Sequence, residues 1–309
     1  MVSVSLAFGP PLDEPAAWTL LRGLAERSRS EGALTEPTGL RLGAGGVLEV
    51  VASDLGSIWI DPNAEPCYGS RAPLSPAVAQ LLSLYLPLCI GSTASTLVIA
   101  HVGQSLDGQI ATASGASRYV TGQDNLVHLH RLRALTDAVI VGASTVECDD
   151  PQLTTRLAVG ENPVRVVIDP HRRVSKTRRV FVDESARTWV VCAKGAAQPV
   201  SLPSSVDVIE IPEREGRLDP RAIVAELSRR GLRRLFVEGG GVTVSRFLSA
   251  RVASRLHVAI SPVILGSGRP GLALPPIDRI DEALRPKTRR FELGEDVLFD
   301  CTLERGDSA

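Results

Sequence analysis

The sequence predicts an α/β protein whose mixed, mostly parallel sheet is flanked by helices. Short apolar runs rich in β-branched residues alternate with helical patterns from residue 97 onward, which is typical of βαβ units. The runs at 138–141 and 235–237 are apolar throughout, as in central strands buried on both faces. The last two expected strands, at 256–260 and 297–303, have no helical pattern between them, which predicts an antiparallel edge.

Residues 96–309 are expected to form the main domain, in which strand and helix patterns follow one another along the chain. We expect helices at 124–135, 220–230 and 243–248, and strands at 97–102, 137–141, 164–168, 188–192, 206–211, 235–237, 256–260 and 297–303.

Residues 1–95 differ in character and are expected to form a small additional α/β region. One helix has an apolar stripe that includes Trp18 and Leu21, and a second begins with Pro76 after the N-cap residue Ser75. The expected elements are a helix at 14–29, a hairpin of strands at 48–52 and 57–60, a helix at 76–86, and a linker of small residues at 91–96.

Composition excludes several classes of function. The 309 residues carry a formal net charge of −1 with both signs mixed along the chain, which argues against a nucleic-acid-binding surface. The longest apolar stretch, at 81–90, is too short to span a membrane and contains Pro87. The first 15 residues lack the basic start and apolar core of a signal peptide.

The cysteines point to a reduced, cytoplasmic protein. The five are far apart, odd in number and without CxxC spacing, so neither a zinc site nor a disulfide framework is expected. The five histidines show no metal-binding spacing, and no metal is expected.

The first candidate site is the segment 138–156, AVIVGASTVECDDPQLTTR, in which an apolar strand runs directly into a polar turn. Ligands of open α/β sheets bind just beyond the carboxyl ends of strands. A hydroxyl, carboxylates and an arginine follow this strand, at Thr145, Asp149 and Arg156. A capped turn would use some of the same residue types.

The second candidate is the segment 235–248, LFVEGGGVTVSRFL, in which a strand leads through a glycine turn into a helix. Glycines allow close approach of the backbone to a ligand, and the helix N-terminus attracts anions. Glu238 places a carboxylate beside this anion site. The spacing is not that of the GxGxxG dinucleotide motif.

Two weaker candidates are the polar loop at 103–122 and a group of arginines. Arg131 and Arg133 lie near the end of the helix at 124–135, and Arg156 closes the first candidate segment. Arginine suits bidentate recognition of phosphate, so any two of these arginines converging with Ser117 would form a phosphate clamp. No nucleophile elbow and no Walker A loop are present.

Together these segments resemble the reductase domain of the bifunctional riboflavin-biosynthesis deaminase/reductase family, whose fold is dihydrofolate-reductase-like. The resemblance covers about residues 97–303. It is carried by SLDGQIATASG (105–115), the helix with Arg133, AVIVGASTVECDDPQLTTR (138–156), PVRVVID (163–169), FVEGGG (236–241) and SPVILGSG (261–268).

The resemblance implies an NADPH-dependent reductase of 5-amino-6-(5-phosphoribosylamino)uracil, with hydride transfer to C1′ of the ring-opened ribosylamine, and a homodimer. It implies that the cofactor is bound by Gly103, Tyr119, Thr145, Asp149, Asp169, Pro170, Gly240, Gly241, Val242 and Thr243. It implies that the substrate is bound by Ser117, Arg133, Leu153, Arg156 and Glu238, and that the catalytic positions are Glu238 and His101.

The chain departs from the family pattern at several positions. Residues 1–95 contain no H-x-E and no P-C-x-x-C, so the zinc deaminase half is expected to be absent. His101 stands where many members carry a lysine, Tyr119 replaces a tryptophan, and Gln104 replaces a small residue. The phosphate clamp is therefore retained while the substrate wall is altered.

Two alternatives follow from these departures. One is a reductase of the same fold that acts on a different heterocycle, such as a pterin-like compound or an intermediate of secondary metabolism. The other is a non-catalytic ligand-binding or scaffold protein that works through residues 1–95. Retention of Thr145, Asp149, Arg156 and Glu238 argues against the second alternative.

Overall fold

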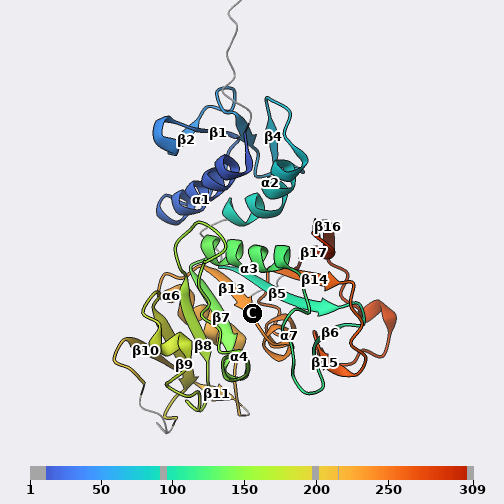
Figure 1. The fold of residues 1–309 in the computed structure, drawn as a ribbon. Helices are drawn as coiled ribbons and strands as arrows, with labels where there is room; N and C mark the ends of the chain where they lie inside the picture. Colours follow the sequence, from blue (N-terminus) through green and yellow to red (C-terminus); the bar gives the residue numbers. More distant parts are fainter. Residues whose placement is uncertain (1–11, 91–95, 197–201, 215, 305–309) are drawn as a thin grey trace, which may run out of the picture. The chain divides into compact units, whose positions relative to one another are not determined.

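The computed structural model describes residues 12–90, 96–196, 202–214 and 216–304 (Figure 1). The chain divides into two compact units, 1–95 and 96–309. The expected linker at 91–96 lies almost entirely outside the described residues. Within the described part, no helix is long and apolar enough to cross a membrane.

The first unit packs two helices and a four-stranded antiparallel sheet in the order β2-β1-β3-β4. Each helix has the N-cap that its sequence predicts: Asp13 accepts from the N–H of Ala16 (2.8 Å), and Ser75 accepts from the N–H of Val78 (3.3 Å). The elements are α1 (Glu14–Ser30), β1 (Thr38–Leu42), η1 (Ala44–Gly46), β2 (Leu48–Val51), β3 (Ile58–Ile60), β4 (Tyr68–Ser70) and α2 (Pro76–Cys89).

The expected hairpin between 48–52 and 57–60 is wrong. Both strands form, but β1 lies between them and pairs with each, so they do not contact each other as partners. Leu40 in β1 is buried, as are Ile58 and Ile60 in β3, so both strands take inner positions and β1 separates β2 from β3. The residues between the two expected strands therefore form a connection that passes from one edge of β1 to the other.

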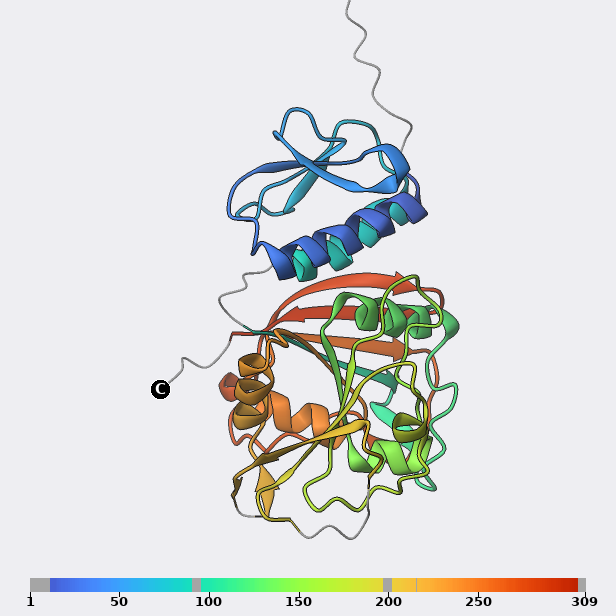
Figure 2. The same ribbon diagram turned by 90° about the vertical axis from the view of Figure 1, so that its left-hand side faces the viewer.

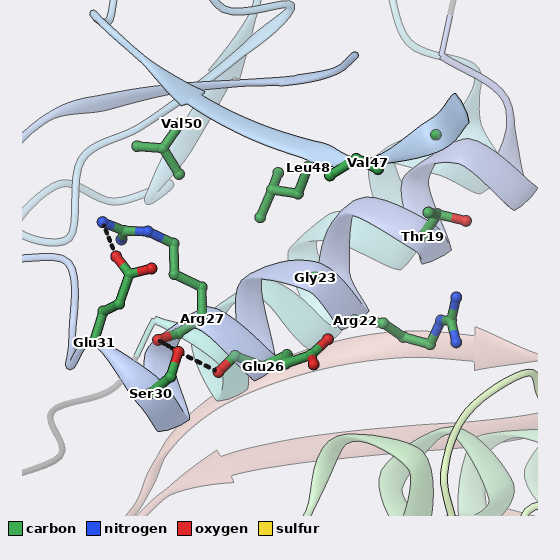
Figure 3. A pocket seen from close by; sticks show the side chains of 11 residues that line it. Thr19, Arg22, Gly23, Glu26, Arg27, Ser30, Glu31, Val47, Leu48 and Val50 are labelled. Atoms are coloured by element: carbon green, nitrogen blue, oxygen red, sulfur yellow. Dashed lines mark hydrogen bonds and ion pairs between the residues drawn. The ribbon is translucent and has the colours of Figure 1, made fainter. Parts of the chain in front are cut away.

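A pocket of about 600 Å³ lies between α1 and β2 in the first unit (Figure 3). Some of the charged side chains that line the pocket neutralise one another, since Arg27 pairs with Glu31 at 2.9 Å. Ser30 donates to the carbonyl oxygen of Arg27 at 3.1 Å, so that hydroxyl is satisfied within the helix.

The second unit is built on a nine-stranded sheet in the order β10-β9-β8-β7-β13-β5-β14-β17-β16. The strands of this sheet are β5 (Leu97–Ser105), β7 (Ala138–Gly142), β8 (Val164–Ile168), β9 (Thr188–Ala193), β10 (Val206–Ile211), β13 (Arg234–Glu238), β14 (Arg255–Ser261), β16 (Lys287–Leu293) and β17 (Asp296–Thr302). Its helices are α3 (Gln123–Leu135), α4 (Ala143–Asp149), α5 (Arg179–Val182), α6 (Pro220–Arg229), α7 (Gly241–Ser249) and η2 (Ile280–Glu282).

The predicted fold class is confirmed. The strands from β10 across to β14 are parallel, and β17 and β16 continue the sheet antiparallel. Figure 2 shows α6 and α7 on one face of the sheet, with α3 and α4 on the other. The core lies mainly where strand side chains meet α6 and α7, and it includes Val237, Val244 and Phe247, all buried.

The structure adds elements that the sequence patterns did not predict. The turn after β7 is a short helix, α4. In the first unit, α2 continues past the expected end at residue 86 to Cys89, so that Pro87 lies inside the helix. The additional strands are β1 and β4 in the first unit and, in the second unit, β16 and two short pairs, β6 (Gln109–Thr112) with β15 (Gly268–Pro270), and β11 (Glu213–Arg214) with β12 (Arg217–Leu218).

Candidate active site

The candidate site lies at the carboxyl ends of the central strands β5, β7 and β13 (Figure 1). β7 leads into α4 at Gly142, and β13 leads through the glycine turn into α7, whose N-cap is Gly240. Neither N-cap makes a side-chain hydrogen bond to its helix. The N–H of Thr243 donates to the carbonyl oxygen of Gly240 at 2.9 Å, so within the part of the chain that the structure describes the N–H groups of Gly241 and Val242 are those available to an anion at this edge of the sheet.

The turns after β7 and β13 contact each other. The N–H of Gly240 donates to Thr145 Oγ1 at 3.1 Å, and a Cβ on Gly239 would lie 3.2 Å from the same oxygen. A Cβ on Gly142 would lie 2.5 Å from Thr243 Oγ1. The two turns approach each other so closely that glycine is required at Gly142 and Gly239. The structure thereby brings together Thr145, Gly240 and Thr243 of the predicted cofactor set.

The next two residues of the glycine turn differ in their surroundings. A Cβ on Gly241 would lie 2.5 Å from the carbonyl oxygens of Pro270 and Gly271, so α7 begins in tight contact with that segment. Val242 is 60% exposed. The start of α7 therefore presents one buried side to the 270–271 segment and one open side to solvent.

Glu238 and Arg133 form a bidentate ion pair. Arg133 Nε donates to Glu238 Oε2 at 2.8 Å, and its Nη2 donates to Oε1. The two side chains are only 8% and 14% exposed. A third donation, from Nη1 to the carbonyl oxygen of Thr154 at 2.9 Å, connects α3 to the segment after α4. The two predicted substrate residues thus hold each other at the end of β13.

Arg156 is exposed, but its backbone is fixed by His130. His130 Nδ1 accepts from the N–H of Arg156 at 2.7 Å and from that of Leu157 at 3.2 Å. A ring nitrogen that accepts carries no proton, so the imidazole is neutral. Burial, followed by the charges of Arg133 and Arg156, lowers the pKa of His130 to about 4, in agreement with this geometry.

His130 is a residue that the sequence analysis did not include in the site. We expect His130→Leu to raise the KM for a phosphorylated substrate about tenfold or more, because two N–H groups lose their acceptor and the Arg156 loop shifts. The KM for the cofactor should stay unchanged. His130→Asn places a carbonyl oxygen near the position of Nδ1 and should restore most of the affinity. Equal kinetics of the Leu variant and the wild type would contradict this positioning role.

The remaining predicted substrate residues border the turn after α4. Ser117 donates to Asp149 Oδ1 at 3.3 Å, which joins a predicted substrate residue to a predicted cofactor residue. Leu153 is buried with a φ of 58°, a left-handed conformation that turns its backbone sharply. Tyr119 also has a positive φ of 68° and is 81% exposed.

His101 lies next to Glu238 in register on the neighbouring strand β5. It is buried, and its Nε2 is 3.0 Å from Asn125 Oδ1 on α3. Burial and the neighbouring His257 lower the pKa of His101 to about 4, so the ring is uncharged at neutral pH. Farther along β5, a Cβ on Gly103 would lie 2.8 Å from the methyl carbon of Thr121.

Asp169 and Pro170 follow β8 and make contacts that shape the chain locally. Asp169 Oδ2 accepts from the N–H of Val174 at 2.8 Å, and the carboxylate is buried. The carbonyl oxygen of Pro170 accepts from the N–H of Ala193 at 3.0 Å. Both residues thus connect the end of β8 with neighbouring segments.

Asp107 joins two of the sequence motifs, although its sequence signal was only that of a turn. Its carboxylate accepts from Ser105 Oγ at 2.5 Å and from the N–H groups of Leu265 and Gly266 at 3.1 and 2.7 Å. These hydrogen bonds, that of Ser105 foremost, lower the pKa of Asp107. The motif at 105–115 is thereby held against the motif at 261–268.

Comparisons with known proteins identify relatives of the second unit. The family described as "RibD C-terminal domain" matches residues 96–294. The 2,5-diamino-6-ribosylamino-4(3H)-pyrimidinone 5′-phosphate reductase of Methanothermobacter thermautotrophicus is 35% identical over 215 residues, which cover 67% of this chain and 98% of that protein. The riboflavin biosynthesis protein RibD of Escherichia coli is 32% identical over 213 residues, which cover 64% of this chain and 57% of that protein.

A solved structure is similar over a large part of the chain. It is that of a diaminohydroxyphosphoribosylaminopyrimidine deaminase/5-amino-6-(5-phosphoribosylamino)uracil reductase from Thermotoga maritima. The TM-score is 0.57 at 27% identity, and the match covers 74% of this chain and 61% of that one. The resemblance that the sequence motifs indicated is therefore confirmed for the family.

Proposed function

The chain belongs to the RibD C-terminal domain family, and from this premise we propose that it is an NADPH-dependent reductase of a phosphorylated ribosylamino-pyrimidine. The reaction is the reduction of 5-amino-6-(5-phosphoribosylamino)uracil to its ribitylamino product. The observation that carries this proposal is the buried Arg133–Glu238 pair, which stands beside the uncapped start of α7.

On the substrate side, the phosphate is bound by Arg156 and Ser117, with Arg133 behind them. Arg156 is exposed as a residue, but partial desolvation of its guanidinium, followed by the charges of Arg133 and Arg179, lowers its pKa. An anion near Arg156 would offset this repulsion between like charges. Glu238 then faces the amine-bearing part of the substrate.

On the cofactor side, the residues present fit a nicotinamide dinucleotide. Added Cβ atoms on Gly239 and Gly240 would lie 3.2 and 3.3 Å from Thr145 Oγ1, so the two turns pack closely and only backbone borders the proposed pyrophosphate at these two positions. The free N–H groups at the start of α7 suit the same anion. Thr145, Asp149 and Thr243 would hold the cofactor on the two turns.

The chemistry depends on alignment and on the exclusion of water. When bound, NADPH supplies a hydride for C1′ of the ring-opened ribosylamine. Arg133, Glu238 and Arg156 orient the substrate so that this carbon faces the cofactor site. His101, buried beside Glu238, is neutral and so adds no positive charge to that of Arg133.

A direct assay tests the proposal. The full chain is incubated with NADPH and either the uracil compound or 2,5-diamino-6-ribosylamino-4(3H)-pyrimidinone 5′-phosphate, which carries an amino group at C2. We expect substrate-dependent oxidation of NADPH and a ribityl product. NADPH binding without turnover of either compound would favour a different heterocycle. No NADPH binding in a fluorescence titration would favour a non-catalytic protein.

Arg156→Ala tests the phosphate clamp. The variant should raise KM for the phosphorylated substrate about 10- to 100-fold, because one charge-assisted contact worth roughly 1.5–3 kcal/mol is lost. The same substitution should have little effect on a dephosphorylated substrate, which serves as the control. If KM for the phosphorylated compound were unchanged, the phosphate would have to bind elsewhere.

Two features of the proposal concern the state of the protein in the cell. We propose that the chain works in the cytoplasm, which its five free cysteines support. We also propose a homodimer, by analogy with other proteins of this fold. Light scattering of the purified chain, coupled to gel filtration, measures the dimer directly.

A further inference from the structure

Helix α3 is attached to the sheet of the second unit in large part through polar side chains. A surface helix usually docks through an apolar stripe. On α3, the buried side chains include an asparagine, two histidines and an arginine: Asn125, His128, His130 and Arg133. A buried polar group costs free energy unless it finds a hydrogen-bond partner, so the partners of these side chains decide where the helix lies.

Three polar pairs join α3 to the adjacent strands β13, β5 and β14, one pair to each strand. The pairs are Arg133–Glu238, Asn125–His101 and His128–His257. The first two belong to the candidate active site. The third is a hydrogen bond between two histidines that the proposed function does not use. His128 Nε2 lies 3.0 Å from His257 Nδ1, and both rings are completely buried.

The strand residues in these pairs form one row across the sheet. Glu238 is in register with His101, and His101 is in register with His257. The row continues through Asp300 on β17 to Arg289 on β16. Side chains at matched positions of adjacent strands point to the same face, which here is the face that α3 covers (Figure 2). The row therefore connects the candidate active site with the antiparallel edge of the sheet.

Asp300 holds the outer part of this row. Its side chain is completely buried and accepts from Arg255 Nε and Nη2 at 2.9 and 2.7 Å and from Arg289 Nη2 at 2.6 Å. His257 Nε2 lies 3.3 Å from Asp300 Oδ1. Because a carboxylate oxygen only accepts, we assign the proton of His257 to Nε2, so that its Nδ1 accepts from His128 Nε2. Burial lowers the pKa of His128 well below its ordinary value, in agreement with a ring that carries one proton.

Hydrogen bonds fix the rotation of a helix more narrowly than apolar contacts do. They require a donor–acceptor distance of about 2.9 Å and a nearly linear angle, whereas the hydrophobic effect is non-directional. The same helix carries residues on which the substrate side of the site depends. Arg133 lies five residues after His128, about 7.5 Å along the helix axis, and His130 holds the N–H of Arg156. A small rotation of α3 would therefore displace both.

We propose that His257, held by Asp300, is a positioning residue that fixes the rotation of α3 through His128 and so aligns the substrate side of the site. The inference rests on the proposed function for the assignment of Arg133 to substrate binding. It gives a role to a residue that lies two strands away from Glu238, about 10 Å across the sheet. His257 acts through the helix and not on the reacting atoms.

The double variant His128→Leu/His257→Leu separates positioning from stability. It removes both partners of the hydrogen bond and fills their space with apolar side chains, so the urea midpoint of unfolding should stay close to that of the wild type. The KM for the phosphorylated pyrimidine should nevertheless rise about tenfold or more, while the Kd for NADPH changes by less than about twofold. A folded double variant with the wild-type KM would overturn the inference.

Single variants of His257 test whether the hydrogen bond itself is responsible. His257→Leu removes the ring nitrogen that faces His128 Nε2 and should raise the same KM about tenfold or more. His257→Asn places an amide near the position of Nδ1, where it can pair with His128 as donor or as acceptor. This variant should keep KM within about threefold of the wild-type value. Equal KM values in the two single variants would contradict the positioning role.

Hydrogen exchange of the Arg133 Nε proton, followed by NMR, tests the inference without substrate. This proton lies in the buried pair with Glu238. It should exchange about tenfold faster or more in the double variant, and at the wild-type rate in His257→Asn. Thr188→Val, which removes a buried hydroxyl that donates to a carbonyl oxygen near β9, is the matched control and should leave the exchange unchanged.

The exchange measurement separates this inference from the proposed function. Unchanged exchange of the Arg133 proton in the double variant would overturn the inference even if the enzyme reduces its pyrimidine substrate. Faster exchange in the double variant of a chain that turns over no pyrimidine would support the positioning of α3 by His257 and contradict only the proposed reaction.

Discussion

Arg133→Ala is expected to lower the free energy of unfolding of the second unit by about 3–5 kcal/mol, the range measured when one partner of a buried ion pair is removed. The cause is the carboxylate of Glu238, which is 14% exposed and would lose both of its guanidinium donors. The carbonyl oxygen of Thr154 would lose a donor as well.

Urea denaturation measures this loss. Trp189 lies in β9 of the second unit, so its fluorescence follows that unit when Trp18 and Trp59 of the first unit are replaced by phenylalanine. The double variant Arg133→Ala/Glu238→Ala leaves no buried charge unpaired and should lose less stability than the two single variants together. A loss below 1 kcal/mol in Arg133→Ala would mean that the pair is as weak as an exposed one.

The sheet could be predicted because most of its strands are continuous apolar runs. β7 and β13 are buried along almost their whole length, so their sequences carry a strong signal. β16 lacks this signal, since only Phe291 and Leu293 of its seven residues are buried. The pairs β6–β15 and β11–β12 are shorter still, and their pairing depends on contacts between distant segments.

The site was predictable to a similar degree. Parallel strands place their carboxyl ends at one edge of a sheet, which explains why Thr145 and Gly240, both assigned to the cofactor by the resemblance, lie in contact although 95 residues separate them. The partner of Arg133 was not predictable, because a carboxylate and a phosphate attract a guanidinium equally. The role of His130 depends on a loop conformation that no periodic pattern encodes.

Glu238→Gln is expected to lower kcat about 5- to 30-fold. Glutamine keeps the size of the side chain and can accept one hydrogen bond from Arg133, but it removes the negative charge that faces the substrate amine. Exchanging a charge-assisted hydrogen bond for a neutral one costs about 1–2 kcal/mol, and each 1.4 kcal/mol is about tenfold in rate.

The affinity for NADPH separates this effect from general damage to the site. Glu238 precedes the glycine turn and pairs with Arg133, on the side of the proposed phosphate clamp, so the Kd for NADPH should change by less than about twofold. Glu226→Gln, which removes a carboxylate from an ion-paired cluster on α6, is the control and should leave kcat unchanged. A large loss of NADPH binding in Glu238→Gln would instead place the Glu238 carboxylate in the cofactor subsite. Only a direct contact between this carboxylate and the cofactor would make the affinity for NADPH depend on the charge of Glu238.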